Sequence, residues 1–263
     1  MAQKNVWITW LASAACNVSI DAVGQPLANN GLKVSGSDWV NDLEKMAWKE
    51  LANVLLDPAQ TDIWLIACDQ ASLNDADNRY ALSLVCALLK ENRPTGFAIC
   101  LVGLDFKPVL QQLPTLLRDA KLMDFSDNAW AASVAASAFL PQRFEAADYR
   151  FSVRADPTFG QWFEVGATSG DWAGVMFGVT DDAKISYHAV GPKGVLPEKT
   201  VLEYQIQDMK AKIADTDFTV WSVQNTVNNE SSYFIRVDGN PSQIIFGGHP
   251  GAEDAEVSVI TLI

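Results

Sequence analysis

Residues Ile63–Cys68 form an unbroken apolar run within the stretch from Thr61 to Asp69. Apolar and polar positions do not alternate in this run. A strand that is buried on both faces of a parallel sheet has this pattern, because helices cover both of its faces. The sequence therefore predicts that this run is the central strand of a parallel sheet and that the segments on either side are its neighbours.

The first half of the chain alternates short apolar segments with helical patterns. In the clearest helical pattern, Trp39, Leu43 and Met46 recur at three- and four-residue spacing, which places them on one helix face. The predicted strands are residues 6–10, 32–35, 63–68, 97–102 and 121–125, and the predicted helices are residues 12–29, 39–54, 77–90, 109–118 and 129–139.

This alternation predicts a flavodoxin-like α/β domain, a five-stranded parallel sheet with helices on both faces. Ligands of such sheets bind beyond the carboxyl ends of the strands. The loops that follow Trp10, Ser35, Asp69, Gly103 and Phe125 form that edge. The candidate ligand-binding residues there are Thr9, Trp10, Ser35 and Asp69.

The pattern changes after Pro141-Gln142-Arg143, where helical periodicity ends and short alternating blocks begin. Blocks of this kind, separated by Gly, Pro, Asn and Asp, predict an antiparallel β-sandwich or flattened barrel. We expect two domains, residues 1–143 and 144–263. The predicted strands are residues 150–154, 161–165, 174–179, 184–189, 200–205, 219–223, 232–237, 243–246 and 256–263. The pattern also fits a longer strand through Val201, Tyr204 and Ile206, and one or two helical turns over residues 207–213.

The charge balance excludes some classes of partner. The formal net charge is −13, and no Lys/Arg cluster offsets it, so nucleic acid and anionic membrane surfaces would be repelled. No apolar run is long enough to span a membrane as a helix.

The four cysteines all lie in apolar segments and form no C-x-x-C pair. This is typical of free thiols in a reducing cytosol rather than of a disulfide, zinc or redox motif. We therefore expect a cytoplasmic protein, and we interpret the apolar residues 5–16 as the first strand and the start of a helix rather than as a signal peptide.

Four segments carry a resemblance to a known family. They are Val6-Trp7-Ile8-Thr9-Trp10, the strand at 63–68, residues 99–102 with Leu113-Pro114-Thr115-Leu116-Leu117-Arg118, and residues 121–130 with Asp124-Phe125-Ser126-Asp127. Their order resembles that of the bacterial Toll/interleukin-1 receptor (TIR) fold. The resemblance covers the first domain and implies assembly through protein contacts.

TIR enzymes cleave the glycosidic bond of NAD, and the resemblance implies one Glu on the helix after the third strand. A carboxylate there stabilises the developing oxocarbenium ion. In this chain residues 72–83 contain no Glu, and the acids in this region are Asp75 and Asp77. Asp is shorter by one methylene, and both acids are also placed to cap a helix. The absence of the Glu that the family has favours a protein that binds a ligand over one that cleaves it. Asp75 and Asp77 remain the catalytic candidates.

The chain is also similar to response-regulator receiver domains in two places. Asp69 ends the third strand, where receivers accept a phosphoryl group, and Lys107-Pro108 is a Lys-Pro pair. However, no acid follows the first strand to hold magnesium, and the Lys-Pro pair follows strand four instead of strand five. We therefore do not expect phosphorylation of Asp69.

The second domain offers a few further candidates. His188 and His249 have no metal-ligand spacing, and His249 lies in the loop Gly247-Gly248-His249-Pro250-Gly251, which fits either a ligand approach or a tight hairpin. Trp162 and Trp172 are placed to stack on a sugar or to anchor a partner if they are exposed, and they are core residues if they are buried. Because strands alternate faces, Trp162 is the better surface candidate.

Together these observations predict a non-catalytic recognition or signalling protein. The TIR-like domain would assemble with itself or with a protein partner, and the β domain would sense or dock. No cofactor is expected. The alternatives are an NAD or nucleotide glycohydrolase that uses Asp75 or Asp77, with NAD as ligand or substrate, and a carbohydrate-binding β domain.

Overall fold

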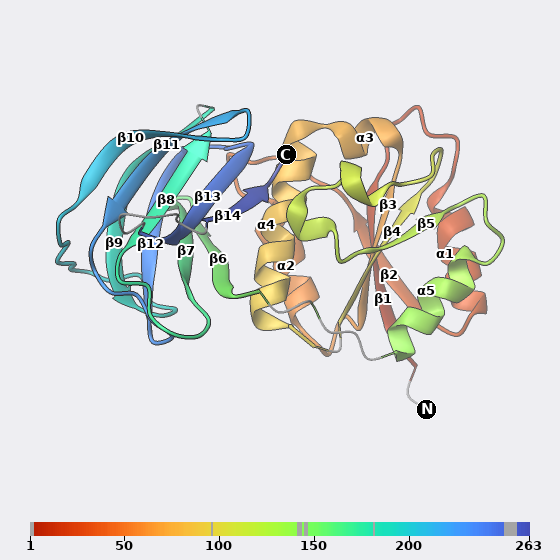
Figure 1. Ribbon diagram of the computed structural model, residues 1–263. Coiled ribbons are helices and arrows are strands. Elements are labelled where there is room, and N and C mark those ends of the chain that lie inside the picture. Colours follow the sequence, from red (N-terminus) through yellow and green to blue (C-terminus); the bar gives the residue numbers. More distant parts are fainter. Residues whose placement is uncertain (1–2, 96, 141–143, 145–146, 181, 250–256) are drawn as a thin grey trace. The chain divides into compact units, whose positions relative to one another are not determined.

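The computed structural model describes residues 3–95, 97–140, 144, 147–180, 182–249 and 257–263 (Figure 1). The chain divides into two compact units, Met1–Glu145 and Ala146–Ile263, and the predicted division lay after residue 143. Within the described ranges, none of the helices is long and apolar enough to cross a membrane.

The first unit is built around a five-stranded parallel sheet in the order β2-β1-β3-β4-β5, as predicted. Its elements are β1 (Asn5–Leu11), α1 (Ile20–Asn29), β2 (Lys33–Asp38), α2 (Trp48–Leu56), β3 (Ile63–Cys68), α3 (Gln70–Asn74), α4 (Ala76–Asn92), β4 (Ala98–Gly103), the 3₁₀ turns η1 (Leu110–Gln112) and η2 (Thr115–Leu117), β5 (Lys121–Asp124) and α5 (Trp130–Phe139).

Helices cover both faces of this sheet. In Figure 1, α1 and α5 lie on one face, and α2 and α4 lie on the other, where they pack against each other. Every residue of β3 and β4 is buried as a result. The unbroken apolar run thus occupies the centre of the sheet, which explains why its residues do not alternate.

Three predicted helices differ from the structure. The predicted helix at 109–118 is wrong, because Pro114 has no N–H to donate and holds Leu113 extended (ψ 150°), so only η1 and η2 form on either side. The helix predicted from residue 12 begins at Ile20, where Ser19 caps it, and the helix predicted from residue 39 begins only at Trp48.

The second unit consists of two antiparallel sheets, in the orders β6-β7-β12-β9 and β10-β11-β8-β13-β14, which confirms the predicted fold class. Its strands are β6 (Tyr149–Asp156), β7 (Gly160–Ala167), β8 (Val175–Thr180), β9 (Ala183–Pro192), β10 (Ile206–Ile213), β11 (Thr216–Val223), β12 (Ser231–Gly239), β13 (Gln243–Gly248) and β14 (Val257–Thr261).

Aromatic rings fill the space between the two sheets. Phe163 of β7 stacks on Phe177 of β8 with ring centroids 5.7 Å apart, and Phe151 of β6 stacks on Phe246 of β13 at the same distance. Stacks of this kind add to the free energy gained by burying the rings. The sheets therefore form a sandwich with an aromatic core.

Two predictions for residues 200–213 are wrong. Residues 200–205 are not a strand, and residues 207–213 form most of β10 rather than helical turns. From Met209 to Ile213 apolar and polar residues alternate, which suits a strand, and β10 pairs with β11. A β-bulge between Ile206 and Met209, with Asp208 at φ 57°, interrupts the pairing at its start.

Candidate functional site

The carboxyl edge of the parallel sheet is the first candidate site. Asp69 directly follows β3 and caps α3, with Oδ1 accepting a hydrogen bond from the Ser72 backbone N–H at 2.7 Å. Its Oδ2 accepts two more bonds from Ser13, one from the backbone N–H at 2.7 Å and one from Oγ at 2.5 Å. Asp69 is only 2% exposed and joins the loop after β1 to the start of α3.

The hydrogen bonds decide the ionisation of this carboxyl. Burial by itself raises the pKa of Asp69, but the hydrogen bonds from Ser13 and Ser72 outweigh burial and hold the pKa below its ordinary value. Asp69 is therefore ionised at neutral pH with both oxygens engaged by its own unit. It is placed to organise loops rather than to receive a ligand.

The other predicted residues at this edge do not converge on one surface. Thr9 is 1% exposed, and its hydroxyl accepts a hydrogen bond from Trp64 Nε1 at 2.8 Å. Trp10 is half-buried against the core, and the half-buried Ser35 donates to the Val6 carbonyl at 3.4 Å. These three side chains therefore pack against the sheet and its core.

Asp75 and Asp77, the candidate catalytic acids, lie at the start of α4. Asp75 is its N-cap and accepts a hydrogen bond from the Asn78 N–H at 2.9 Å. Asp77 lies in the first turn, and both residues are exposed. A carboxylate at this end of a helix satisfies free N–H groups and interacts favourably with the helix dipole.

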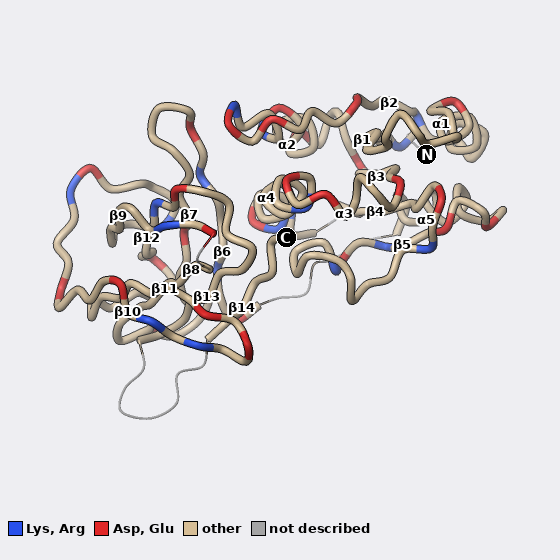
Figure 2. The backbone as a smooth tube through the Cα atoms, turned by 90° about the horizontal axis from the view of Figure 1, so that it is seen from above, with Lys and Arg blue, Asp and Glu red and all other residues tan. Residues whose placement is uncertain are grey.

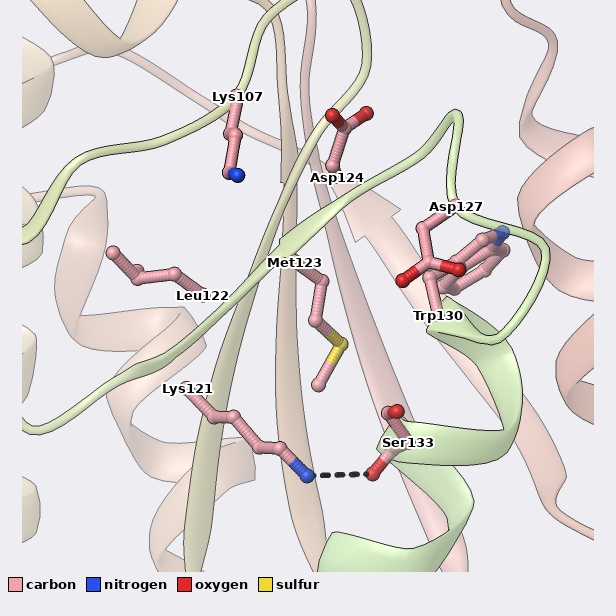
Figure 3. A pocket seen from close by; sticks show the side chains of 8 residues that line it. All are labelled: Lys107, Lys121, Leu122, Met123, Asp124, Asp127, Trp130 and Ser133. Atoms are coloured by element: carbon pink, nitrogen blue, oxygen red, sulfur yellow. Dashed lines mark hydrogen bonds between the residues drawn. The ribbon is translucent and has the colours of Figure 1, made fainter.

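A pocket of about 260 Å³ lies beside β5 and α5 (Figure 3). It is lined by Lys107, Lys121, Leu122, Met123, Asp124, Asp127, Trp130 and Ser133. Within the pocket, Lys121 Nζ donates to the Ser133 carbonyl at 3.3 Å. The Ser126 hydroxyl, the Ser126 N–H and the charge of Lys107 lower the pKa of Asp124. Two lysines and two aspartates offset each other, so the pocket suits a small polar ligand rather than a strongly charged one.

The described residues contain no group of three or more His, Cys, Asp or Glu side chains arranged to hold a metal ion. The pocket was not predicted from the sequence. The signal that could have indicated it is the acidic segment Asp124-Phe125-Ser126-Asp127, which was interpreted only as part of the resemblance to the TIR fold.

The four cysteines are free thiols that differ in burial. Cys68, Cys86 and Cys100 are buried, and burial raises the pKa of the Cys86 and Cys100 thiols to about 12. Cys16 is half-buried. The first three thiols are therefore protonated and shielded at neutral pH, and they fill the core as small apolar groups.

We expect a thiol-specific maleimide to label Cys16 in the native protein and all four cysteines in denaturant. Intact-mass spectrometry counts the labels, and peptide mapping assigns them. Rapid native labelling of Cys68, Cys86 or Cys100 would show that the sheet core is not closed as described. A Cys16→Ser variant provides the matched control and should remain unlabelled while native.

Trp162 of β7, the better candidate for a surface aromatic, is buried and only 8% exposed. Its Nε1 donates to the Phe159 carbonyl at 2.9 Å, and Leu196, from the long connection after β9, packs against the cluster that Trp162 forms with Ala189 and Phe234. Trp162 is therefore a core ring, the alternative to an exposed one. Strand alternation places Trp162 on the outer face of the sheet, but a covering segment buries that face.

Trp172 and His249 do lie near each other, at the ends of β8 and β13. Trp172 is half-buried, forms an antiparallel bridge with Val227 and rests against Gly248. The His249 N–H donates to the Gly174 carbonyl at 2.8 Å, and a Cβ at Gly174 would lie only 2.7 Å from the His249 Cβ. Position 174 therefore requires a glycine, because His249 lies too close for a side chain there. The remainder of the predicted loop, Pro250 and Gly251, lies outside the described residues.

Residues 193–205, which connect β9 to β10, are tied down along their length. The Gly194 N–H donates to Glu164 Oε1 at 2.7 Å, and Thr200 Oγ1 bonds both the N–H and the carbonyl of Val190 at 2.9 and 3.1 Å. Near its end, the Glu203 N–H donates to Asn225 Oδ1 at 2.9 Å. This connecting segment covers the outer face around Trp162 and bonds the backbone of the edge strand β9.

The end of the connecting segment meets a buried histidine. His188 of β9 is 3% exposed; its Nδ1 lies 2.7 Å from Tyr233 Oη, and its Nε2 lies 3.1 Å from Gln205 Oε1. The Trp221 ring packs edge-on at 4.8 Å. Burial lowers the pKa of His188, and the Gln205 contact opposes this shift only in part. His188 is therefore neutral at pH 7 and holds the segment to the sandwich.

The comparisons with known proteins do not assign the chain to a family. A scan against models of protein families finds no match, and a search of curated proteins finds none either.

Proposed function

We propose that this protein is a non-catalytic recognition protein whose β unit docks a protein partner. The observation that carries the proposal is the presence of large exposed apolar side chains on a fixed segment of the sandwich. Val195, Val201 and Tyr204, all in the connecting segment, are 61%, 80% and 78% exposed. Apolar surface that stays exposed on a hydrogen-bonded framework is typical of protein interaction sites.

The first unit is proposed to act as a TIR-like scaffold that assembles through protein contacts. Its sheet order, β2-β1-β3-β4-β5, is the flavodoxin-like order, which agrees with such a domain. The bonding of Asp69 and the capping position of Asp75 favour a structural role for the acids near the carboxyl edge. The sugar-binding alternative loses support because Trp162 is buried.

We expect the full-length protein to leave NAD intact at every concentration tested, because Asp75 and Asp77 lie where they serve the start of α4. The measurement is NAD consumption by the wild type, Asp75→Ala and Asp77→Ala, with elution size recorded on the same samples. Asp21→Ala, which removes an exposed acid from the first turn of another helix of the unit, α1, is the control.

NAD turnover that disappears in Asp75→Ala or Asp77→Ala but survives in Asp21→Ala would show that the protein is a glycohydrolase and would contradict the recognition function. The structural role predicts instead a small loss of stability in Asp75→Ala, about 1 kcal/mol as for other N-caps, with no activity in any variant.

A further inference from the structure

Strand β5 is an edge strand of the parallel sheet, because the order β2-β1-β3-β4-β5 ends with it. Figure 2 shows β2 and β5 at the opposite ends of this sheet. Within the described part of the chain β5 pairs only with β4, so one side of its main chain is bonded and the other side points away from the sheet. An edge of this kind offers its N–H and C=O groups to an added strand.

The direction of each main-chain group of β5 follows from the pairing with β4. The N–H of Phe125, the residue after β5, donates to the Gly103 carbonyl at 3.0 Å. Main-chain groups of alternate residues in a strand point to the same side, so those of Met123 also point toward β4. The N–H and C=O of Leu122 and the N–H of Asp124 therefore point to the free edge. No described residue bonds these groups.

The pocket beside β5 and α5 extends along this free edge. All four residues of β5, Lys121–Asp124, line it. Side chains of successive strand residues point to opposite faces of a sheet, and Figure 3 shows Leu122 and Met123 on opposite sides of the strand. A pocket that touches every residue of the strand must therefore border the main chain between the two faces. The cavity of about 260 Å³ thus lies next to the unbonded groups of Leu122.

The charges around the pocket balance on both sides of the strand. Lys121 donates to the Ser137 hydroxyl of α5 at 3.1 Å, so it lies on the α5 side, where Asp127 precedes the helix. Asp124 points to the other side, where the positive charge of Lys107 acts on it. Each side carries one lysine and one aspartate, so the pocket favours an occupant without net charge.

We propose that the free edge of β5 binds an extended, uncharged peptide segment of a protein partner, which adds to the five-stranded sheet as a further strand. The donors and the acceptor of Leu122 and Asp124 recur along the strand at the spacing of another extended main chain. Met123 and Trp130 line the α5 side of the pocket and give it an apolar wall. The inference goes beyond the proposed function, because it places a peptide site on the first unit, and its failure leaves docking on the second unit unaffected.

NMR of the full-length protein, isotope-labelled at its methionine methyl groups, tests the proposal because Met123 lines the pocket. The probe is acetyl-Thr-Val-Thr-Val-Thr-amide, an uncharged peptide of strand-forming residues. We expect it to shift the Met123 signal, which Met123→Leu assigns, with a millimolar dissociation constant that salt changes little. The signals of Met176 and Met209 in the second unit should stay in place. The same peptide with all central residues N-methylated should not bind, because neither of its edges can pair.

Leu122→Pro removes an outward N–H without removing a bond to β4, and edge strands tolerate proline at such positions. It should raise the dissociation constant about fivefold or more, the equivalent of one main-chain hydrogen bond. Val34→Pro is the matched control in the other edge strand, β2. The Lys33 N–H donates to the Lys4 carbonyl at 2.8 Å, toward β1, so the Val34 N–H points outward. Val34→Pro should leave binding unchanged.

An unshifted Met123 signal overturns the inference, and so does equal binding of the N-methylated peptide. Equal weakening by Leu122→Pro and Val34→Pro would also overturn it, because the peptide would then not select the edge of β5. If Leu122→Pro fails to fold, the comparison of the two peptides on the wild type decides.

Discussion

Replacing Asp69 by Ala lowers the free energy of unfolding of the first unit by about 3 kcal/mol, because three hydrogen bonds to a charged, buried carboxylate are lost. The Ser13 N–H and Oγ and the Ser72 N–H all donate to this carboxylate. The substitution also removes the cap of α3. Hydrogen exchange of the β3 and β4 amides in the full-length protein measures the loss within the first unit.

Asp105→Ala is the matched control for this prediction. Asp105 follows β4 at the same edge, but it is exposed and accepts one bond, from the Gln70 N–H at 2.9 Å. Its loss should cost about 1 kcal/mol or less. Equal effects of Asp69→Ala and Asp105→Ala would contradict the organising role of Asp69.

Acidification should reproduce part of the Asp69→Ala effect. The pKa of Asp69 is lowered in the folded state, so its contribution to stability is complete above the ordinary value of 3.8 and is lost as the pH falls below that value. In Asp69→Asn, whose amide nitrogen cannot accept the Ser13 bonds, this part of the acid dependence should be absent.

The sequence predicted the parallel sheet well because burial on both faces leaves a local signal. The central strand, Ile63–Cys68, has the predicted bounds, and β4 and β5 agree with prediction to within one residue at each end. In such strands the apolar run extends over the whole strand and is bounded by polar residues. No long-range information is needed to recognise them.

Elements that depend on distant contacts were not predictable in the same way. Periodicity suggested a helix at 109–118, although Pro114 is a local signal against it. For β10, the alternation from Met209 to Ile213 was present in the sequence, but pairing with β11 decides the conformation. Trp162 shows the limit of strand alternation, which assigns a face but cannot reveal that a later segment covers it.

The same distinction, between features set by the local sequence and features set by distant contacts, applies to the candidate sites. The position of Asp69 at the end of a strand could be predicted from the sequence, but its bonds to Ser13 join residues 56 positions apart. The exposure of Tyr204 likewise depends on bonds that Glu203 and Gln205 make to other elements. A polar or aromatic residue can be placed by its strand or loop, whereas its availability for binding depends on the tertiary structure.

His188 gives the second large effect, because it is buried and both ring nitrogens are engaged. In the neutral tautomer that suits these contacts, Nε2–H donates to Gln205 Oε1 and Nδ1 accepts from the Tyr233 hydroxyl. Protonation places a second N–H against that hydroxyl. The groups packed on the ring are a phenol, an indole and the amides of Gln205 and Gln207, and none is a carboxylate that would stabilise the cation.

The sandwich should therefore lose stability as the pH falls. The pKa of His188 is lowered from 6.5 in the folded state, so the unfolded state binds more protons once the pH drops below that value. Stability is complete above about pH 6.5 and declines in more acidic solution. Hydrogen exchange in β9 and β12 as a function of pH measures the decline, and His249→Gln, which removes the other histidine of the chain, should leave it unchanged.

His188→Phe should lower the free energy of unfolding of the second unit by about 3 kcal/mol at pH 8, because it leaves the buried Tyr233 hydroxyl and the Gln205 amide without this partner. It should also abolish the decline below pH 6.5. Adding Tyr233→Phe should restore part of the loss, since replacing both partners by apolar groups of similar shape removes the unsatisfied hydroxyl. If the double variant is less stable than His188→Phe by the full cost of Tyr233→Phe alone, the two residues do not interact in the folded state. A decline below pH 6.5 that persists in His188→Phe would show that the pH dependence has another origin.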